Sequence, residues 1–112
     1  MEIKLNIGLN TQEGKPLNKV DVISEILKLK HIYVVEAKEV IGTYKEEIEP
    51  TLFVNISYRT KSLSQLISEI ESLTIALKQD CIAVVTPMGS FMTFNPDYNG
   101  ERFRFNPSLF KE

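Results

Sequence analysis

Few side chains in this sequence combine a type and a spacing that would support catalysis. His31 is the only histidine and Cys81 the only cysteine. A general base or a nucleophile needs a partner that orients and activates it, and no such partner stands at a recognisable spacing from either residue. We therefore expect His31 to end a helix and Cys81 to lie in the core. An enzyme built on this chain would use His31 or a tyrosine such as Tyr33 or Tyr58.

Metal and nucleotide motifs give no stronger signal. The carboxylates of Glu46, Glu47 and Glu49 crowd one segment, but a calcium loop needs a glycine at its sharp turn and ligands at alternating positions. Gly89 and Gly100 stand in turn sequences and belong to no glycine-rich phosphate loop. The sequence predicts no metal site and no cofactor, and it favours a solvated acidic loop around Glu46.

Aromatic and basic residues are better candidates for a binding surface, because aromatic side chains and arginine are enriched where proteins meet. Phe53 stands in an alternating segment, with Arg59 and Lys61 a few positions beyond it. The whole sequence has ten aromatic residues, six Phe and four Tyr. Six of these ten lie in the stretch 91–110 toward the C-terminus. The candidate interaction residues are Phe53, Arg59, Arg102, Phe103, Arg104, Phe105 and Phe110.

Two readings of the aromatic C-terminal segment compete. It either folds back over the open face of a sheet near Phe53, or it presents its aromatic side chains to another chain. We expect packing within the chain, because exposed apolar patches of that size are rare on monomers.

Hydrophobic periodicity predicts the elements that would position these residues. Strands alternate apolar and polar residues, whereas helices repeat their apolar residues every three or four positions. In the helix that opens at Ser62, a capping residue is followed by Gln65 at the third position. Strands are expected over 2–9, 32–44 with a bulge near Lys38 and Glu39, 51–58, 81–85 covered on both faces, and 91–94. Helices are expected over 18–30, with Val20, Ile23, Ile26, Leu27 and Leu29 toward the sheet, and over 62–77.

This order of elements predicts an α+β fold, a ferredoxin-like βαββαβ sandwich with two helices on one face of an antiparallel sheet. The first and third strands would be central. A C-terminal β-hairpin extension follows, so we expect one domain over 1–112, with a core over 1–86 and a hairpin and tail over 87–112. At 112 residues the chain is long enough for one such core.

The RNA-recognition motif shares this order of elements and stacks bases on aromatic residues of its central strands. Here the first strand would present Glu2, Lys4, Asn6 and Gly8 on the open face, with no aromatic residue among them. The net charge of −2 supplies no general attraction for nucleic acid. Nucleic acid is therefore an unlikely partner, although Phe53 and its basic neighbours keep it as an alternative.

The composition indicates the class of protein and the compartment in which it works. Hydrophobic residues make up 43% and charged residues 25% of the chain, the balance of a globular domain. A single cysteine allows no intrachain disulfide and is typical of a reducing compartment. No apolar run reaches the length of a membrane span. We expect a cytoplasmic protein with no membrane partner.

One part of the chain carries a resemblance. The stretch from Leu77 to Val84, followed through a glycine turn by the stretch from Phe94 to Tyr98, resembles small uncharacterised proteins encoded by phages and other mobile elements. The resemblance implies a cytoplasmic accessory protein that works by binding, and it carries over no catalytic residues.

We expect a non-enzymatic binding or protein-interaction module that forms a homo-oligomer, because sheets of this kind have open faces and edges that symmetric partners cover. The alternatives are a nucleic-acid-binding domain that uses the open sheet face, and a small enzyme or small-ligand-binding protein.

Deletion of the chain from Asn99 onward tests the role of the aromatic C-terminus. Each aromatic side chain contributes roughly 1.5–3 kcal/mol when fully buried, so the truncated protein should melt at a lower temperature, aggregate or change its mass. Light scattering and thermal melts at two concentrations measure these effects, because stability that depends on assembly varies with concentration. An unchanged mass and melting temperature would show that the segment has no structural role.

Overall fold

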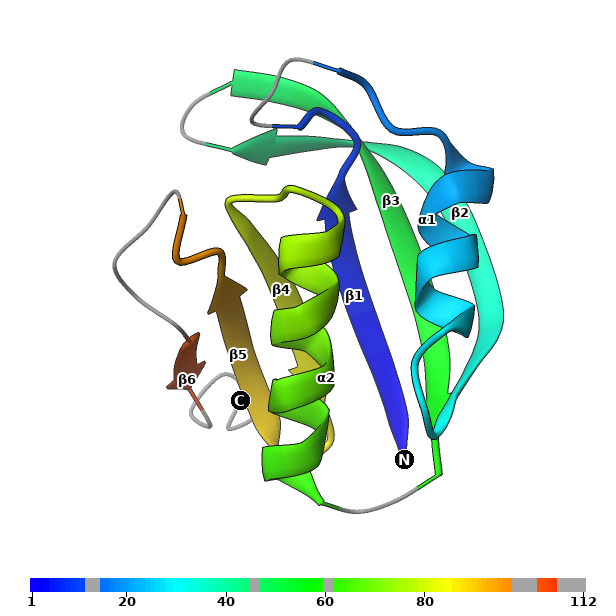
Figure 1. The fold of residues 1–112 in the computed structure, drawn as a ribbon, viewed down its shortest axis with the longest axis vertical. Coiled ribbons are helices and arrows are strands. Elements are labelled where there is room, and N and C mark those ends of the chain that lie inside the picture. Colours follow the sequence, from blue (N-terminus) through cyan, green and yellow to red (C-terminus); the bar gives the residue numbers. More distant parts are fainter. Residues whose placement is uncertain (12–14, 45–46, 60–61, 98–102, 107–112) are drawn as a thin grey trace.

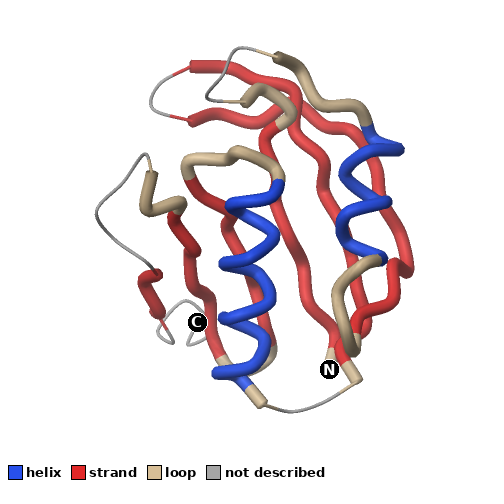
Figure 2. Tube along the Cα trace, in the orientation of Figure 1, coloured by secondary structure: helices blue, strands red, loops and turns tan. Residues whose placement is uncertain are grey.

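Two helices cover one face of an antiparallel sheet in the computed structural model, which describes residues 1–11, 15–44, 47–59, 62–97 and 103–106 (Figure 1). Figure 2 shows both helices on the same side of the strands. The predicted α+β class is thus confirmed. The elements are β1 (Glu2–Gly8), α1 (Lys19–Leu27), β2 (Ile32–Tyr44), β3 (Glu47–Tyr58), α2 (Leu63–Ala76), β4 (Cys81–Thr86), β5 (Gly89–Phe94) and β6 (Phe103–Asn106).

The six described strands lie in the order β2-β3-β1-β4-β5-β6, and each pair of neighbours is antiparallel. β1 pairs with β3 along its whole length, from Glu2 opposite Ser57 to Gly8 opposite Thr51. On its other side β1 pairs with β4. Among the first four strands β1 and β3 are therefore central, as the sequence predicts.

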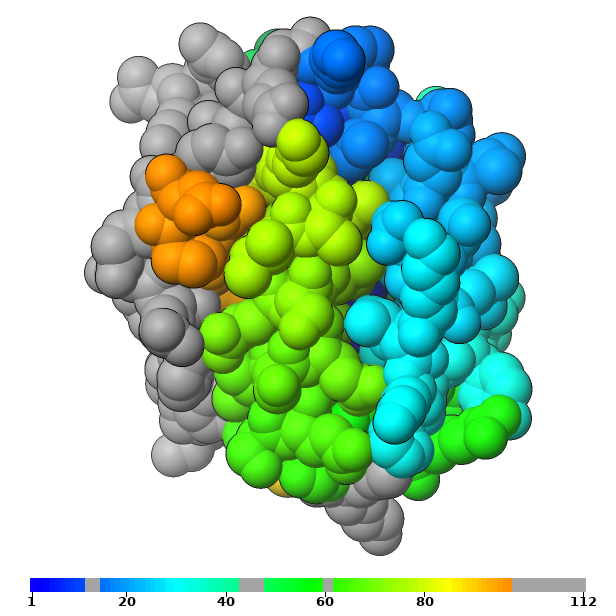
Figure 3. Space-filling view, viewed as in Figure 1, coloured from blue at the N-terminus to red at the C-terminus, as the bar shows by residue number. Residues whose placement is uncertain are grey.

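The core lies between the sheet and the two helices. Leu5 and Val54 pair across β1 and β3 and are both fully buried on the helix-covered face. The alternating residues of the same strands point to the opposite face, which neither of the two described helices covers. Figure 3 shows α1 and α2 side by side over the covered face. The buried apolar side chains of the strands and of α2 include Ile3, Leu5, Ile7, Leu52, Val54, Ile56, Ile82, Val84, Leu66, Ile70 and Leu73.

The bulge in β2 lies earlier than predicted. The pairing with β3 shifts between Val34 and Glu36, so Val35 is the extra residue and the sheet is regular at Lys38 and Glu39. Val34 and Ala37 both pack against the core although they are three positions apart. Strict alternation would place two such residues on opposite faces, so the inserted residue is what keeps both on the helix side.

The first helix is shorter than predicted. It begins after Asn18, whose side chain accepts a hydrogen bond from the Asp21 amide, and it ends at Leu27. Its buried residues are Val22 and Ile26, whereas Val20 and Leu27 of the predicted stripe are 74% and 58% exposed. In a helix of nine residues, one pair four positions apart is enough to contact the sheet.

The structure confirms the prediction for the start of the second helix but not the prediction for the strand after it. The Gln65 amide donates a hydrogen bond to Ser62 Oγ, which confirms the predicted N-cap of α2. In β4, buried residues alternate with half-buried ones, so the expected cover on both faces is wrong. No described helix is long and apolar enough to cross a membrane.

The C-terminal segment extends the sheet at its edge. β4 and β5 form a hairpin in which Thr86 pairs with Gly89, a residue with a φ of 151° that favours glycine. Phe91 and Phe94 of β5 are buried within the chain. β6 pairs with β5, so the described residues 103–106 lie beside β5 and not over the face near Phe53. Outside the described residues lie Arg102 and Phe110, together with the side chains of Phe103, Arg104 and Phe105.

Replacement of Ile70 by aspartate tests the packing of α2 on the sheet. Ile70 is fully buried, so Ile70→Asp would place an unpaired charge in the core and should cost several kcal/mol, on the order of the whole stability of a small domain. Thermal melts measure the loss. Ser68→Asp places the same charge on the exposed side of the same helix and should melt close to the wild type. A cooperative wild-type-like transition in Ile70→Asp would contradict the assigned core.

Candidate functional site

The predicted aromatic and basic residues do not form one site. Phe53 is half-buried on the open face of β3, as expected, and its basic neighbour is Lys38, whose Nζ lies 6.0 Å from the ring centroid. The Arg59 guanidinium instead stacks on the Tyr33 ring, 3.8 Å from its centroid. Phe53 is five positions before Tyr58, the last residue of β3, a distance of about 17 Å, and Arg59 lies just beyond that end. Lys61 lies outside the described residues.

The open face of β1 carries the polar residues that the sequence predicts. Lys4 and Asn6 pair with Asn55 and Phe53 of β3, and Glu2 and Gly8 continue the same row. Phe53 is therefore the aromatic residue on the described part of this face of β1 and β3.

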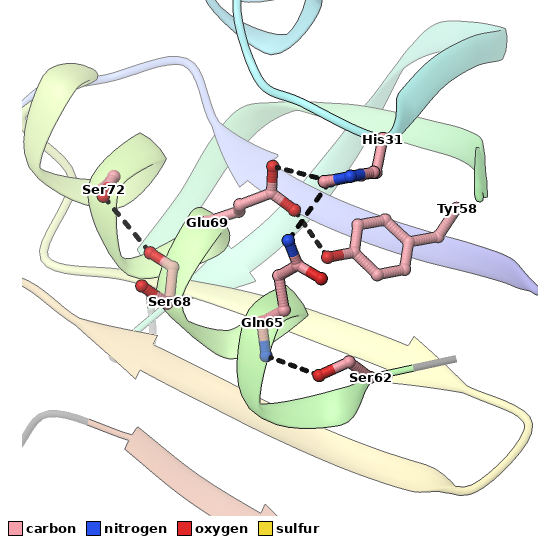
Figure 4. A network of polar contacts seen from close by, with 7 residues as sticks. All are labelled: His31, Tyr58, Ser62, Gln65, Ser68, Glu69 and Ser72. Carbon is pink, nitrogen blue, oxygen red and sulfur yellow. Dashed lines mark hydrogen bonds and ion pairs between the residues drawn. The ribbon is translucent and has the colours of Figure 1, made fainter. Parts of the chain in front are cut away.

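His31 has the partners that sequence spacing did not reveal. On the helix-covered side of the sheet, His31, Tyr58, Gln65 and Glu69 point toward one another from three parts of the chain (Figure 4). The Tyr58 hydroxyl donates a hydrogen bond of 2.6 Å to Glu69 Oε2. His31 Nδ1 lies 3.9 Å from Glu69 Oε1 and 3.3 Å from Gln65 Nε2. We call these four residues the polar cluster.

The fold explains how the polar cluster forms. Tyr58 is the last residue of β3 and continues its buried row, so its ring lies on the helix side. Gln65 and Glu69 are four positions apart and therefore share one side of α2. The Arg59 amide donates to the His31 carbonyl over 2.8 Å, which holds the turn before β2 beside the end of β3.

His31 has a φ of 68°, in the left-handed region. Its ring meets the Tyr58 ring edge to face, with centroids 6.2 Å apart. A histidine held in this backbone conformation is well placed to turn the chain sharply from α1 into β2. The same turn brings the imidazole over the N-terminal half of α2, which contains Gln65 and Glu69.

In the polar cluster the carboxylate of Glu69 is largely shielded from water, whereas His31 is partly open to solvent. Tyr58 is 1% exposed, and the side chains of Glu69 and His31 are 15% and 32% exposed. A hydrogen bond from a phenol to a carboxylate is charge-assisted, so it fixes the orientation of Glu69. In neutral His31, Nδ1 can accept from the Gln65 amide, whereas in protonated His31 the same nitrogen can donate toward Glu69. The arrangement can attract a cationic group or accept a proton.

Comparisons with known proteins identify a solved structure with a similar fold. Neither a scan against protein-family models nor a search of curated proteins finds a match. Among solved structures, a phage SAM lyase in the apo state is similar, with 18% sequence identity and a TM-score of 0.53. The similarity covers 74% of this chain and 75% of that chain. The two chains share a fold. A phage protein is thus a structural neighbour, while no sequence family is found.

Sequence reasoning missed this cluster for a physical reason. Gln65 is 34 positions from His31 along the chain, and no spacing rule connects a turn before one strand to the first turns of a later helix. The available signal was the pair Gln65 and Glu69, two polar residues on one side of α2 next to its apolar stripe. Tyr58 was a second signal, because a tyrosine in a buried row needs a partner for its hydroxyl.

Cys81 is also placed differently from the expectation. It was expected in the core, but it is half-buried and belongs to the row of β4 that alternates with buried Ile82 and Val84. That row faces the open side of the sheet, because Ile82 and Val84 of the other row belong to the core under the two described helices.

Removal of the Tyr58 hydroxyl tests the energy of the cluster. Tyr58→Phe keeps the buried ring and loses the hydrogen bond to Glu69, which should lower the free energy of unfolding by about 1.5–3 kcal/mol. Tyr33→Phe is the matched control, because Tyr33 is 49% exposed and its ring contact with Arg59 remains. Urea unfolding of both variants measures the difference. Equal stabilities would show that the Tyr58 hydrogen bond adds nothing.

Proposed function

We propose that the protein binds S-adenosylmethionine at the polar cluster and cleaves it as a lyase. The observation that carries this proposal is the Glu69 carboxylate, which is mostly withdrawn from water and oriented by the Tyr58 hydroxyl. The neighbouring fold supports it, because the similar solved structure is a phage SAM lyase, and we take SAM to be S-adenosylmethionine. This proposal puts the enzyme alternative ahead of the non-enzymatic binding module expected from sequence.

The chemistry of the ligand suits the cluster. S-adenosylmethionine carries a sulfonium cation, and an anionic side chain with little water around it attracts a cation more strongly than an exposed one does. In lyase cleavage a carbon–sulfur bond breaks and its electron pair stays on sulfur, which leaves as a neutral thioether. In the same step the neighbouring carbon loses a proton, and the electrons of that C–H bond form a carbon–carbon double bond. Glu69 is placed to accept that proton, while Tyr58 holds its carboxylate in position.

The same proposal includes the fold class of the protein and the compartment in which it works. We assign the chain to the ferredoxin-like class, since its first four strands have the order β2-β3-β1-β4 and a helix follows β1 and β3. We place the protein in the cytoplasm, which its single cysteine favours. Its relation to phage proteins is supported by the resemblance of its sequence and by its structural neighbour.

A second proposal keeps the expected homo-oligomer. Ile41 and Ile48 of the β2–β3 hairpin are 80% and 74% exposed, and no helix within the described residues lies over the open face around Phe53. Surfaces of this kind on a small protein are typical of contacts between chains. The mass of the intact protein in the light-scattering measurement above tests this proposal, because the mass of a single protomer would contradict it.

The activity has a direct test. The protein is incubated with S-adenosylmethionine, and mass spectrometry follows loss of the substrate and release of a thioether such as 5′-methylthioadenosine. Glu69→Gln keeps the shape of the side chain and removes its charge and basicity, so the rate should fall at least about 100-fold. Glu71→Gln changes a carboxylate on the same helix outside the cluster and should keep the wild-type rate.

Thermal melts accompany both variants, so that a loss of rate is assigned to chemistry only in a folded protein. If the wild-type protein neither cleaves nor binds S-adenosylmethionine in calorimetry, the proposal is wrong. A wild-type rate in Glu69→Gln would keep the activity but move it away from the polar cluster.

A further inference from the structure

His31 has two alternative partners in the polar cluster. Its Nδ1 lies 3.3 Å from Gln65 Nε2 and 3.9 Å from Glu69 Oε1. An amide nitrogen donates and a carboxylate accepts, so Nδ1 has to accept in the first contact and donate in the second. The neutral imidazole can accept at Nδ1, whereas the imidazolium carries a hydrogen on both ring nitrogens and can only donate. The protonation state of His31 therefore decides which partner its Nδ1 binds.

The two carboxylate oxygens of Glu69 have different surroundings. Oε2 accepts the Tyr58 hydroxyl over 2.6 Å, and Oε1 is the oxygen that faces His31 (Figure 4). Within the described part of the chain these are the polar contacts of the Glu69 side chain. Beside a neutral imidazole, Oε1 is therefore the oxygen that a cationic ligand can approach. Beside an imidazolium, the same oxygen already has a positive partner.

Other carboxylates on the elements around His31 point elsewhere. Glu25 of α1 accepts a hydrogen bond from Lys28 Nζ over 2.9 Å. Glu71 is two positions from Glu69, so it lies on a different side of α2. Within the described residues, Glu69 is the carboxylate that pairs with His31. The charge of the imidazole thus acts on one anionic group.

The basic groups around the turn leave Glu69 to His31. The Arg59 guanidinium stacks on the ring of a β2 tyrosine, and the Met1 ammonium donates to the carbonyl of the last β3 residue over 2.9 Å. Lys30, next to His31 in the chain, is exposed. No basic side chain of the described residues other than His31 lies within ion-pair distance of Glu69. Because histidine is the side chain that ordinarily titrates near neutral pH, protonation of His31 is what changes the charge of the cluster there.

We propose that protonation of His31 regulates cation binding at the polar cluster: the imidazolium pairs with Glu69 and excludes a cationic ligand, and the neutral imidazole leaves the carboxylate available. This regulation rests on the proposed function, which takes the sulfonium of S-adenosylmethionine as that cation. Opposite charges about 4 Å apart attract strongly where little water separates them, so His31 and the ligand compete for the same carboxylate. Histidine gains its charge between about pH 8 and pH 5. Affinity should therefore be high on the neutral side of this range and fall on the acidic side.

Unfolding without a ligand tests the pairing of His31 with Glu69. The variants His31→Asn, Glu69→Gln and the double variant form a cycle that isolates the interaction of the two side chains. Asparagine is uncharged and, like histidine, is found in the left-handed backbone region that His31 occupies. Urea midpoints are measured at a lower pH of about 5.5 and a higher pH of about 7.5, on either side of the ordinary titration of histidine. The interaction should raise the midpoint at the lower pH and vanish at the higher pH.

A second ion pair supplies the matched control. Lys28 Nζ lies 2.9 Å from Glu25 Oε1 near the end of α1. Lysine and glutamate ordinarily keep their charges across this pH range. A cycle built from Lys28→Gln and Glu25→Gln should therefore give the same interaction at both pH values. The comparison separates the titration of His31 from general effects of pH on stability.

Two ligands separate the charge of the ligand from its shape. Sinefungin carries an ammonium group where S-adenosylmethionine carries its sulfonium, and S-adenosylhomocysteine has a neutral thioether at the same position. In calorimetry, sinefungin should bind at least about fivefold more weakly at the lower pH, because most of His31 is then charged. The affinity for S-adenosylhomocysteine should change less than about twofold. In His31→Asn, sinefungin should bind equally well at both pH values, and thermal melts at both confirm that the variant is folded.

Three results would count against these proposals, and they differ from one another. An interaction between His31 and Glu69 that is no stronger at the lower pH would overturn the regulation, whatever the protein binds. A sinefungin affinity that falls equally in the wild type and in folded His31→Asn would also overturn it, because another group would then cause the change. Absence of binding of both S-adenosylmethionine and sinefungin at either pH would overturn the proposed function, while the urea cycle still decides whether protonated His31 pairs with Glu69.

Discussion

The pairing of β1 with β3 is the interaction on which the rest of the structure depends. It runs from Glu2 opposite Ser57 to Gly8 opposite Thr51, and it aligns two alternating rows so that their apolar members share one face. Because the side-chain period of a strand is two, a slip of one residue would turn one whole row to the other face. The helices can pack only where both rows are apolar, so this register decides which face they cover.

The same register divides the polar chemistry between two places. Tyr58 ends the buried row of β3, and its hydroxyl reaches Glu69 on the helix side. Thr51 and Glu49, near the other end of the strand, belong to the row on the open side, where they border a hollow in the surface. One strand therefore contributes to both places, with different environments. On the helix side the carboxylate is withdrawn from water, and on the open side the lining of the hollow is a mixture of carboxylates and amides.

The sequence predicts much of this fold because strong periodic patterns leave little choice. Alternation over 2–9 and 51–58 and the apolar stripe of the second helix lead to the observed strands and helix. Details that depend on contacts between distant elements were not predictable. The bulge at Val35 arises because the core requires both Val34 and Ala37. The short α1 contacts the sheet through Val22 and Ile26. The helical periodicity of its sequence does not by itself show which apolar residues face the sheet.

The candidate sites were harder to predict than the fold. The expectation for His31 relied on partners at short spacing, whereas its partners come from α2. Cys81 was expected in the core because no activating partner stands at a recognisable spacing from it, but only alternate residues of β4 are deeply buried. Phe53 was placed on the correct face, since strand alternation alone decides that. Residues that meet across the fold can be recognised only after the strand order and register are known.

The bulge at Val35 has a consequence for how copies of this chain can meet. β2 is one edge of the described sheet, and a long, regular edge is a template on which an added strand can grow. The extra residue interrupts the row of backbone donors and acceptors and increases the local twist. An incoming strand can therefore pair continuously only with the residues before the bulge or with those after it. The bulge therefore shortens the continuous edge that β2 offers to an added strand.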